Sequence, residues 1–137
     1  MTAPPDVGIA INEDLLIPDP AARRRILDHI AEAGLDHVTT GDHISFHGGA
    51  GFDGLVSATS VLAAHDSLDV LVGVYLAGLR HPLVTARQLA TISQLAPGRL
   101  VLGVGVGGED RSDHARFCFR DNSAGSRAND CLQAPYL

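Results

Sequence analysis

The sequence predicts an α/β fold built on a parallel sheet, and three observations lead to this class. Four β-rich apolar runs begin near residues 7, 35, 69 and 99, so their starts lie 28, 34 and 30 residues apart. Helix-like segments fill the intervals, and strands that alternate with helices in this way form βαβ units with parallel strands. The runs are also apolar on consecutive positions, as at 70–72 and 100–102, which is typical of strands buried on both faces.

The first two units are predicted from their caps and apolar stripes. A strand at 7–11 is followed by Asp19 as N-cap and Pro20 at the first helical position, and Gly34 stands where a left-handed C-terminal residue is expected. A second strand at 35–40 precedes a helix capped by Asp53. The residues predicted to face inward from these helices are Ile26, Leu27, Ile30, Ala33, Leu55, Ala58 and Leu62.

The last elements end in a stretch with few structural signals. A third strand is predicted at 68–76, Pro82 opens a third helix that residues 96–98 terminate, and a fourth strand follows at 99–106. Leu89, Ile92 and Ala96 are the inward residues of this helix. We treat residues 1–137 as one partial domain, in which 1–113 hold four βα units and 114–137 are a divergent tail or a truncated fourth helix.

Composition limits the partners that we expect. The chain is 45% apolar with a net charge of -6, and its basic run is confined to 23–25, which argues against a nucleic-acid partner. The N-terminus has no signal-peptide pattern, and no apolar run reaches the roughly 18 residues of a membrane span. Cys118 and Cys131 are interpreted as reduced thiols. We therefore expect a cytoplasmic protein with a small-molecule substrate.

Asp42 and His43 directly follow the second strand and are the first candidate catalytic residues. They fall at the carboxyl end of a parallel strand, where active sites of such folds are built. A histidine there can move a proton near neutral pH, and a neighbouring carboxylate can set its tautomer. The alternative is that Asp42 caps the following turn and His43 is a surface residue.

The glycine run at 103–108 has three interpretations. Gly103, Gly105 and Gly108 match the dinucleotide fingerprint, but the acidic stretch 109–113 follows where a phosphate-binding helix should begin. The glycines can instead let a flat cofactor ring lie against bare backbone, or merely relieve crowding between strand and helix. A metal site is not expected, because glycines after His47 prevent a helix that would align it with His43.

Three segments in this order resemble the luciferase-like superfamily, which contains FMN-dependent monooxygenases and oxidoreductases that use the deazaflavin coenzyme F-420. They are the Asp-His pair, GVYLAGLRHP at 73–82 and PGRLVLGVGVGGE at 97–109. The resemblance covers roughly residues 7–113 and implies a (β/α)8 barrel. The F-420-dependent branch is the most similar one, with FMN as the alternative cofactor, and a homodimer is a further expectation from the family.

The resemblance also assigns residues to roles. His43 corresponds to a proton-transfer or substrate-orienting group beside the reactive ring, and Asp42 to a residue that positions it. A bulge with a non-prolyl cis peptide, expected near Val74, Tyr75 and Leu76, backs the ring, although Tyr75 is bulkier than the residue often found there. Glu109 resembles an acid at the mouth of the fourth strand, with an offset of one residue, and Gly105 and Gly107 are assigned to cofactor contact.

The family's strands five to eight and the cofactor phosphate site that they carry have no counterpart in these residues. We therefore expect the N-terminal half of a barrel, not closed, that folds poorly alone and binds cofactor weakly or not at all. For the parent protein the resemblance implies hydride transfer between a deazaflavin and an organic substrate. The alternatives are an FMN-dependent monooxygenase, a non-catalytic half-barrel that pairs its strand edges with a second copy, and a gene fragment.

Overall fold

A computed structural model describes residues 4–11, 19–43 and 52–106. Its strands form one parallel sheet in the order β1 (Gly8–Ala10), β2 (His37–Thr40), β3 (Asp69–Leu76) and β4 (Leu100–Gly105). The strands neighbour one another in chain order, as successive barrel staves do, and the described sheet is not closed. An open sheet with the first strand in its middle is thereby excluded for these residues, and the dinucleotide-fold interpretation of the glycine run with it.

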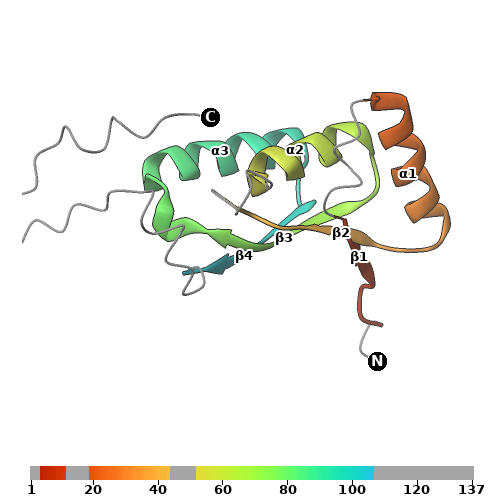
Figure 1. The fold of residues 1–137 in the computed structure, drawn as a ribbon, viewed down its shortest axis with the longest axis horizontal. Helices are drawn as coiled ribbons and strands as arrows, with labels where there is room; N and C mark the ends of the chain where they lie inside the picture. Colours follow the sequence, from red (N-terminus) through yellow and green to blue (C-terminus); the bar gives the residue numbers. More distant parts are fainter. Residues whose placement is uncertain (1–3, 12–18, 44–51, 107–137) are drawn as a thin grey trace, which may run out of the picture.

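Three helices cover one face of this sheet: α1 (Pro20–Glu32), α2 (Gly54–Ala64) and α3 (Pro82–Leu95) (Figure 1). A short 3-10 turn, η2 (Ala77–Leu79), connects β3 to α3. The predicted caps are present, since Asp19 accepts a hydrogen bond from the amide of Ala21, and Asp53 accepts from the amides of Leu55 and Val56. The capping residues therefore predict the starts of α1 and α2 correctly.

Two glycines end helical units with positive φ. Gly34 follows α1 with a φ of 80°, and Gly98 follows α3 with a φ of 74°. Residues with a Cβ rarely adopt this conformation, so glycine lets the chain reverse sharply towards the next strand. The turn after α1 leads into β2 and the turn after α3 into β4.

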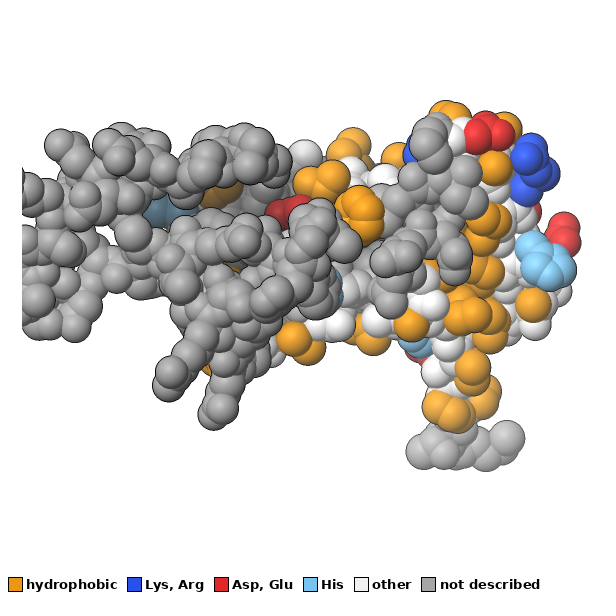
Figure 2. Space-filling model, in the orientation of Figure 1, with side chains coloured by type: hydrophobic (Ala, Val, Ile, Leu, Met, Phe, Trp, Pro, Cys, Tyr) orange, Lys and Arg blue, Asp and Glu red, His pale blue; other side chains and the backbone are white. Residues whose placement is uncertain are grey.

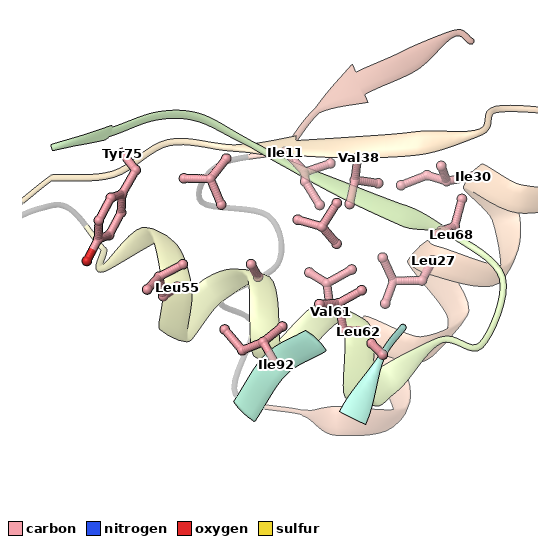
Figure 3. Close-up of a cluster of buried hydrophobic side chains, with 14 residues drawn as sticks. Ile11, Leu27, Ile30, Val38, Leu55, Val61, Leu62, Leu68, Tyr75 and Ile92 are labelled. Atoms are coloured by element: carbon pink, nitrogen blue, oxygen red, sulfur yellow. The ribbon is translucent and has the colours of Figure 1, made fainter. Parts of the chain in front are cut away.

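The hydrophobic core lies between the sheet and the helices (Figure 3). Helices α1 and α2 supply most of its helical part, whereas α3 contributes Ile92 and has the residue after its end, Ala96, beside it. The predicted inward residues are confirmed, with Ile26 and Leu89 only partly buried, except for Ala33, which is exposed because it caps the end of α1. The side chains with almost no exposed surface are Leu27, Val38, Val61, Leu68, Val70, Val72 and Tyr75.

The sheet has a second face, here called the inner face, which the described helices do not cover. Side chains alternate along a strand, so Val38 and Thr40 of β2 are buried on the helix side while Thr39 lies on the inner face. Thr39, Leu71 and Val101 are partners in the register and form one row across three strands. Val101 is 55% exposed, so part of this row is open to solvent.

Apolar residues are also exposed at the two edge strands. Val7 and Ile9 border or belong to β1, and Figure 2 shows hydrophobic side chains on the part of the surface that carries this strand. At the opposite edge, Val104 of β4 is 63% exposed. Unpaired strand edges and exposed apolar side chains favour association with further polypeptide. No helix in the described part of the chain is long and apolar enough to span a membrane.

Candidate functional site

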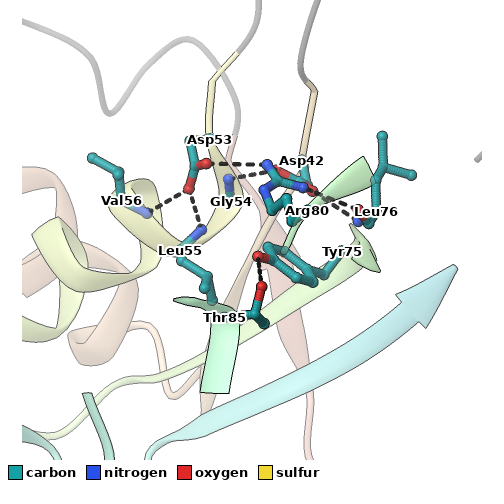
Figure 4. A network of polar contacts seen from close by, with 9 residues as sticks. All are labelled: Asp42, Asp53, Gly54, Leu55, Val56, Tyr75, Leu76, Arg80 and Thr85. Carbon is teal, nitrogen blue, oxygen red and sulfur yellow. Dashed lines mark hydrogen bonds and ion pairs between the residues drawn. The ribbon is translucent and has the colours of Figure 1, made fainter. Parts of the chain in front are cut away.

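Asp42 lies at the carboxyl end of β2, and its carboxylate joins three elements of the fold (Figure 4). Its side chain has no exposed surface. Oδ1 accepts hydrogen bonds from the amide of Gly54 at 2.7 Å and from Nη2 of Arg80 at 2.7 Å. Oδ2 accepts from the amide of Leu76 at 2.8 Å and from Nη1 of Arg80 at 2.6 Å. One carboxylate thus ties the end of β2 to the start of α2 and the end of β3.

Arg80 is the cationic partner of this carboxylate and makes further contacts around it. Nη2 also donates to Asp53 at 3.0 Å, and Nη1 to the carbonyl oxygen of Leu76 at 3.2 Å, while the guanidinium lies 4.4 Å from the centre of the Tyr75 ring. Burial lowers the pKa of Arg80, but hydrogen bonds to Asp42 and Asp53 and their charges raise it by more. The net pKa is above its ordinary value, so Arg80 is always charged.

These contacts correct the expectation that Asp42 points into the mouth of the sheet beside His43. The side chain of Asp42 instead continues the buried alternation of Val38 and Thr40 and turns towards the start of α2. The alternative interpretation of Asp42 as a local cap is closer to the structure, because the carboxylate does accept from the first residue of α2. The two bonds to Arg80 and the bond to Leu76 give it a wider role than a cap.

His43 lies at the carboxyl end of β2, where it was predicted, and its side chain is exposed. Its backbone amide donates to the carbonyl of Phe52 at 3.0 Å. His43 stands three residues beyond the end of β2 at Thr40 and follows Asp42, whose side chain turns towards the start of α2. The structure therefore puts an accessible imidazole next to the carboxyl ends of the strands.

The predicted bulge is present in β3, one residue earlier than expected. Val72 pairs with Leu102 and Tyr75 with Val104, so Gly73 and Val74 together oppose Gly103. The peptide bond between Gly73 and Val74 is cis. A Cβ built on Gly103 would lie 3.1 Å from the carbonyl oxygen of Val72 and 3.5 Å from Cγ1 of Val74. Gly103 thus faces the bulge at a distance that leaves little room for a side chain.

Because of the bulge, the residues of β3 that were assigned to cofactor contact lie on different faces of the sheet. Val74, 47% exposed, lies on the inner face, because its Cγ1 approaches the Cβ position of Gly103. Leu76 pairs with Gly105 on the same side. Tyr75 does not lie there: its side chain is fully buried, and its hydroxyl lies 3.1 Å from that of Thr85 in α3. The assignment of the Tyr75 side chain to a cofactor surface is therefore corrected.

Gly107 and Glu109 lie outside the described residues, as do Cys118 and Cys131. Two residues of the site were not singled out from the sequence. Arg80 stands 38 residues from its main partner, so only the fold shows the contact. Gly54 was overlooked because it directly follows the N-cap Asp53. A glycine at the first position of a helix can nevertheless indicate that another segment approaches the helix backbone closely.

At the carboxyl ends of β3 and β4, few side chains project from the inner face, and those that do are apolar. Gly73, Gly103 and Gly105 contribute no side chains there, and Val74 and Leu76 border them. A surface of this kind suits a flat ring better than a branched polar ligand. The arrangement offers a stacking surface of backbone with a titratable imidazole, His43, on a neighbouring strand end.

The fold is a partial (β/α) barrel. Its strands follow one another in chain order, helices cover one face of the sheet, and the site lies at the carboxyl ends of the strands. The family model described as "Luciferase-like monooxygenase" matches residues 2–128. The chain therefore belongs to the luciferase-like monooxygenase family, whose members are oxidoreductases or monooxygenases. The comparison with curated proteins gave no match.

Solved structures show the same fold. The monooxygenase RslO1 from Streptomyces bottropensis is 24% identical with a TM-score of 0.61, over 80% of this chain and 36% of its own. The oxygenating constituent of 3,6-diketocamphane monooxygenase from the CAM plasmid of Pseudomonas putida, in complex with FMN, is 17% identical with a TM-score of 0.62, over 80% and 32%. The coenzyme F-420-dependent tetrahydromethanopterin reductase from Methanopyrus kandleri is 22% identical with a TM-score of 0.58, over 81% and 29%. This chain spans about a third of their lengths.

Proposed function

We propose that the inner face at the carboxyl ends of β2–β4 is part of the flavin-type cofactor site of an oxidoreductase that acts on a small organic molecule. The observation that carries this proposal is the side-chain-free surface at Gly73 and Gly103, bordered by Val74, with the exposed His43 just after the end of the neighbouring strand β2. Family membership and the FMN and F-420 named for two structural neighbours support it.

The residues present fit a flat tricyclic ring. The Cβ position of Gly73 lies 3.4 Å from Cγ2 of Thr39, and that of Gly103 lies 3.1 Å from backbone, so side chains would fill the surface that a ring needs. Val74, which is 47% exposed, adds apolar contact at its border. Aromatic rings bind well to such apolar, largely pre-formed surfaces.

We propose coenzyme F-420 as the cofactor, which when bound supplies hydride transfer to or from an organic substrate. The chain's own contribution is binding, orientation and proton chemistry. His43 is exposed at the mouth, so its imidazole can donate a proton to the substrate or accept one from it. Asp42 has a structural role in this site: its oxygens already accept four hydrogen bonds, from Gly54, Leu76 and Arg80, and so fix the backbone around it.

The second candidate function is an FMN-dependent monooxygenase. The family description and two of the structural neighbours name monooxygenases, and one of these holds FMN. A 5-deazaflavin ring lacks the nitrogen that makes reduced flavin reactive with oxygen. Cofactor preference therefore separates the two functions.

The test uses the product of the whole open reading frame that contains this chain, titrated with FMN and with F-420 under fluorescence detection. We expect saturable binding, tighter for F-420. Val74→Trp places a bulky side chain on the inner face and should abolish binding. Val56→Trp is the matched control, since Val56 is an exposed valine on α2, away from the inner face.

Tighter binding of FMN would replace the deazaflavin proposal with the monooxygenase. Binding of neither cofactor, or equal loss of binding in both tryptophan variants, would contradict the proposed site.

A further inference from the structure

We infer that Arg80, through its pair with Asp42, is a positioning residue that holds the β3 bulge and residues 42–43 after β2 at a fixed separation. The inference deepens the proposed function, on which its cofactor readout rests. It assigns Arg80 no contact with cofactor or substrate. Its effect is to set where Val74 and His43 stand relative to each other.

The first tie is to Leu76, two residues beyond the bulged Val74. The amide of Leu76 donates to Asp42 Oδ2, and its carbonyl accepts from Arg80 Nη1. Both backbone polar groups of one residue are thus bound by the two members of a single ion pair. Because β3 continues directly from the bulge into Leu76, fixing this residue fixes the end of the bulge.

The second tie is to the segment that returns into α2. The amide of Gly54 donates to Asp42 Oδ1, and Asp53 accepts from Arg80. The amide of His43 donates to the carbonyl of Phe52. Residues 42–43 and 52–54 are therefore held together, and the backbone of His43 is part of this contact.

The energetics favour a positional role over a simple gain in stability. The Asp42 side chain has no exposed surface and that of Arg80 only 14%, so both charges are largely desolvated. A buried ion pair often contributes no more stability than apolar residues of the same volume. What an apolar pair cannot do is bind the amides of Gly54 and Leu76 and the carbonyl of Leu76 in a defined geometry.

The guanidinium is essential to this geometry. Its two terminal nitrogens reach Asp42 Oδ1 and Oδ2 separately and still donate to Asp53 and to the Leu76 carbonyl. A lysine would keep the charge but present one nitrogen, so it cannot keep all four contacts. Arg80→Lys therefore keeps the positive charge and removes the geometry of the guanidinium, so it tests the positioning role separately from the charge.

The experiment compares Arg80→Lys with Arg99→Lys in the product of the whole open reading frame. Arg99 is a matched control, because it also tethers backbone, donating to the carbonyls of His65 and Leu68 at the amino end of the sheet. Hydrogen exchange of segments 54–60 and 73–80 and dissociation constants for FMN and F-420 are measured below the melting temperature. Asp42→Asn, which keeps the shape of the side chain, is the second variant.

We expect exchange at the Leu76 and Gly54 amides to rise about tenfold in Arg80→Lys and not in Arg99→Lys, because Asp42, which accepts from both amides, loses part of the guanidinium contact that holds it, a loss of about one hydrogen bond. The cofactor dissociation constant should rise between about 10- and 10²-fold in Arg80→Lys alone. Equal changes in the two lysine variants would overturn the inference, because the Asp42–Arg80 pair would then contribute only to the overall stability of the protein.

Failure of the proposed function has a different signature. If the wild-type protein binds neither cofactor, the proposed function is wrong, and exchange alone decides the inference. Faster exchange confined to segments 54–60 and 73–80 in Arg80→Lys and Asp42→Asn then supports the positioning role. Unchanged exchange there overturns it.

Discussion

The hydroxyl of Tyr75 lies 3.1 Å from the hydroxyl of Thr85, and this contact connects the end of β3 to α3 beneath the guanidinium of Arg80. Tyr75 is fully buried, whereas Thr85 is half-buried, so the contact is partly shielded from solvent. The contact explains why a large aromatic residue follows the bulge without occupying the inner face.

Tyr75→Phe should destabilise the protein by about 1 kcal/mol, because it leaves the Thr85 hydroxyl without its partner while keeping the ring under Arg80. Thr85→Val should cost a similar amount. The double variant should cost less than the sum of the two, since no polar group is then left unpaired. Urea denaturation measures all three, and strictly additive losses would show that the hydroxyls do not interact.

Gly54→Ala should destabilise the protein by about 1–3 kcal/mol, as overpacking does in other cores. The added Cβ would lie 2.8 Å from Cγ1 of Val72 and 2.9 Å from Cβ of Asp42. Gly78→Ala is the control, because nothing lies within 4 Å of its Cβ position. Thermal melting of the two variants should differ clearly; equal melting temperatures would mean that α2 can shift away from β2 and β3 without cost.

His65→Ala should cost about 1–3 kcal/mol, since it removes the acceptor of two backbone amides, one of them buried. Nδ1 of His65 accepts from Ser67 at 3.3 Å and from Leu68 at 3.2 Å in the turn that leads into β3. His65→Asn should retain most of the stability, because its Oδ1 can take the place of Nδ1. Denaturant midpoints test this order, and an Asn variant no better than the Ala variant would assign the loss to packing.

His43→Ala should change the free energy of unfolding far less than the core substitutions above, because the residue is exposed. In the proposed enzyme it should lower the turnover number by ~10²–10⁴ if the imidazole transfers a proton. The measurement is steady-state turnover of the product of the whole open reading frame with its preferred cofactor. An unchanged turnover number would make His43 a surface residue without a catalytic role.

The strands and helix ends could be predicted from the sequence because their signals are local. Asp19 and Asp53 precede the helices that they cap, and Gly34 and Gly98 have the positive φ that their positions require. Each of these interactions spans only a few residues. The order of the strands also followed, since βαβ units place consecutive parallel strands side by side.

The orientation of the site residues was less predictable because it depends on contacts between distant segments. Asp42 was placed in the mouth by its position after β2, but its oxygens are bound by groups 12, 34 and 38 residues away. Tyr75 was assigned to the cofactor surface by resemblance, and the bulge before it turned its side chain to the other face. Resemblance located the bulge within one residue.

The bulge also makes the length of β3 as important as its composition. Two residues, Gly73 and Val74, stand opposite one, so every side chain after them is out of phase with those before. Removal of Gly73 or Val74 would leave one residue opposite Gly103 and restore simple alternation, with Tyr75 still on the helix side and Leu76 still opposite Gly105. A one-residue deletion in the bulge would therefore remove the extra backbone beside Gly103 and keep both faces of the sheet, whereas a one-residue deletion elsewhere in β3 would move the residues on one side of it to the opposite face.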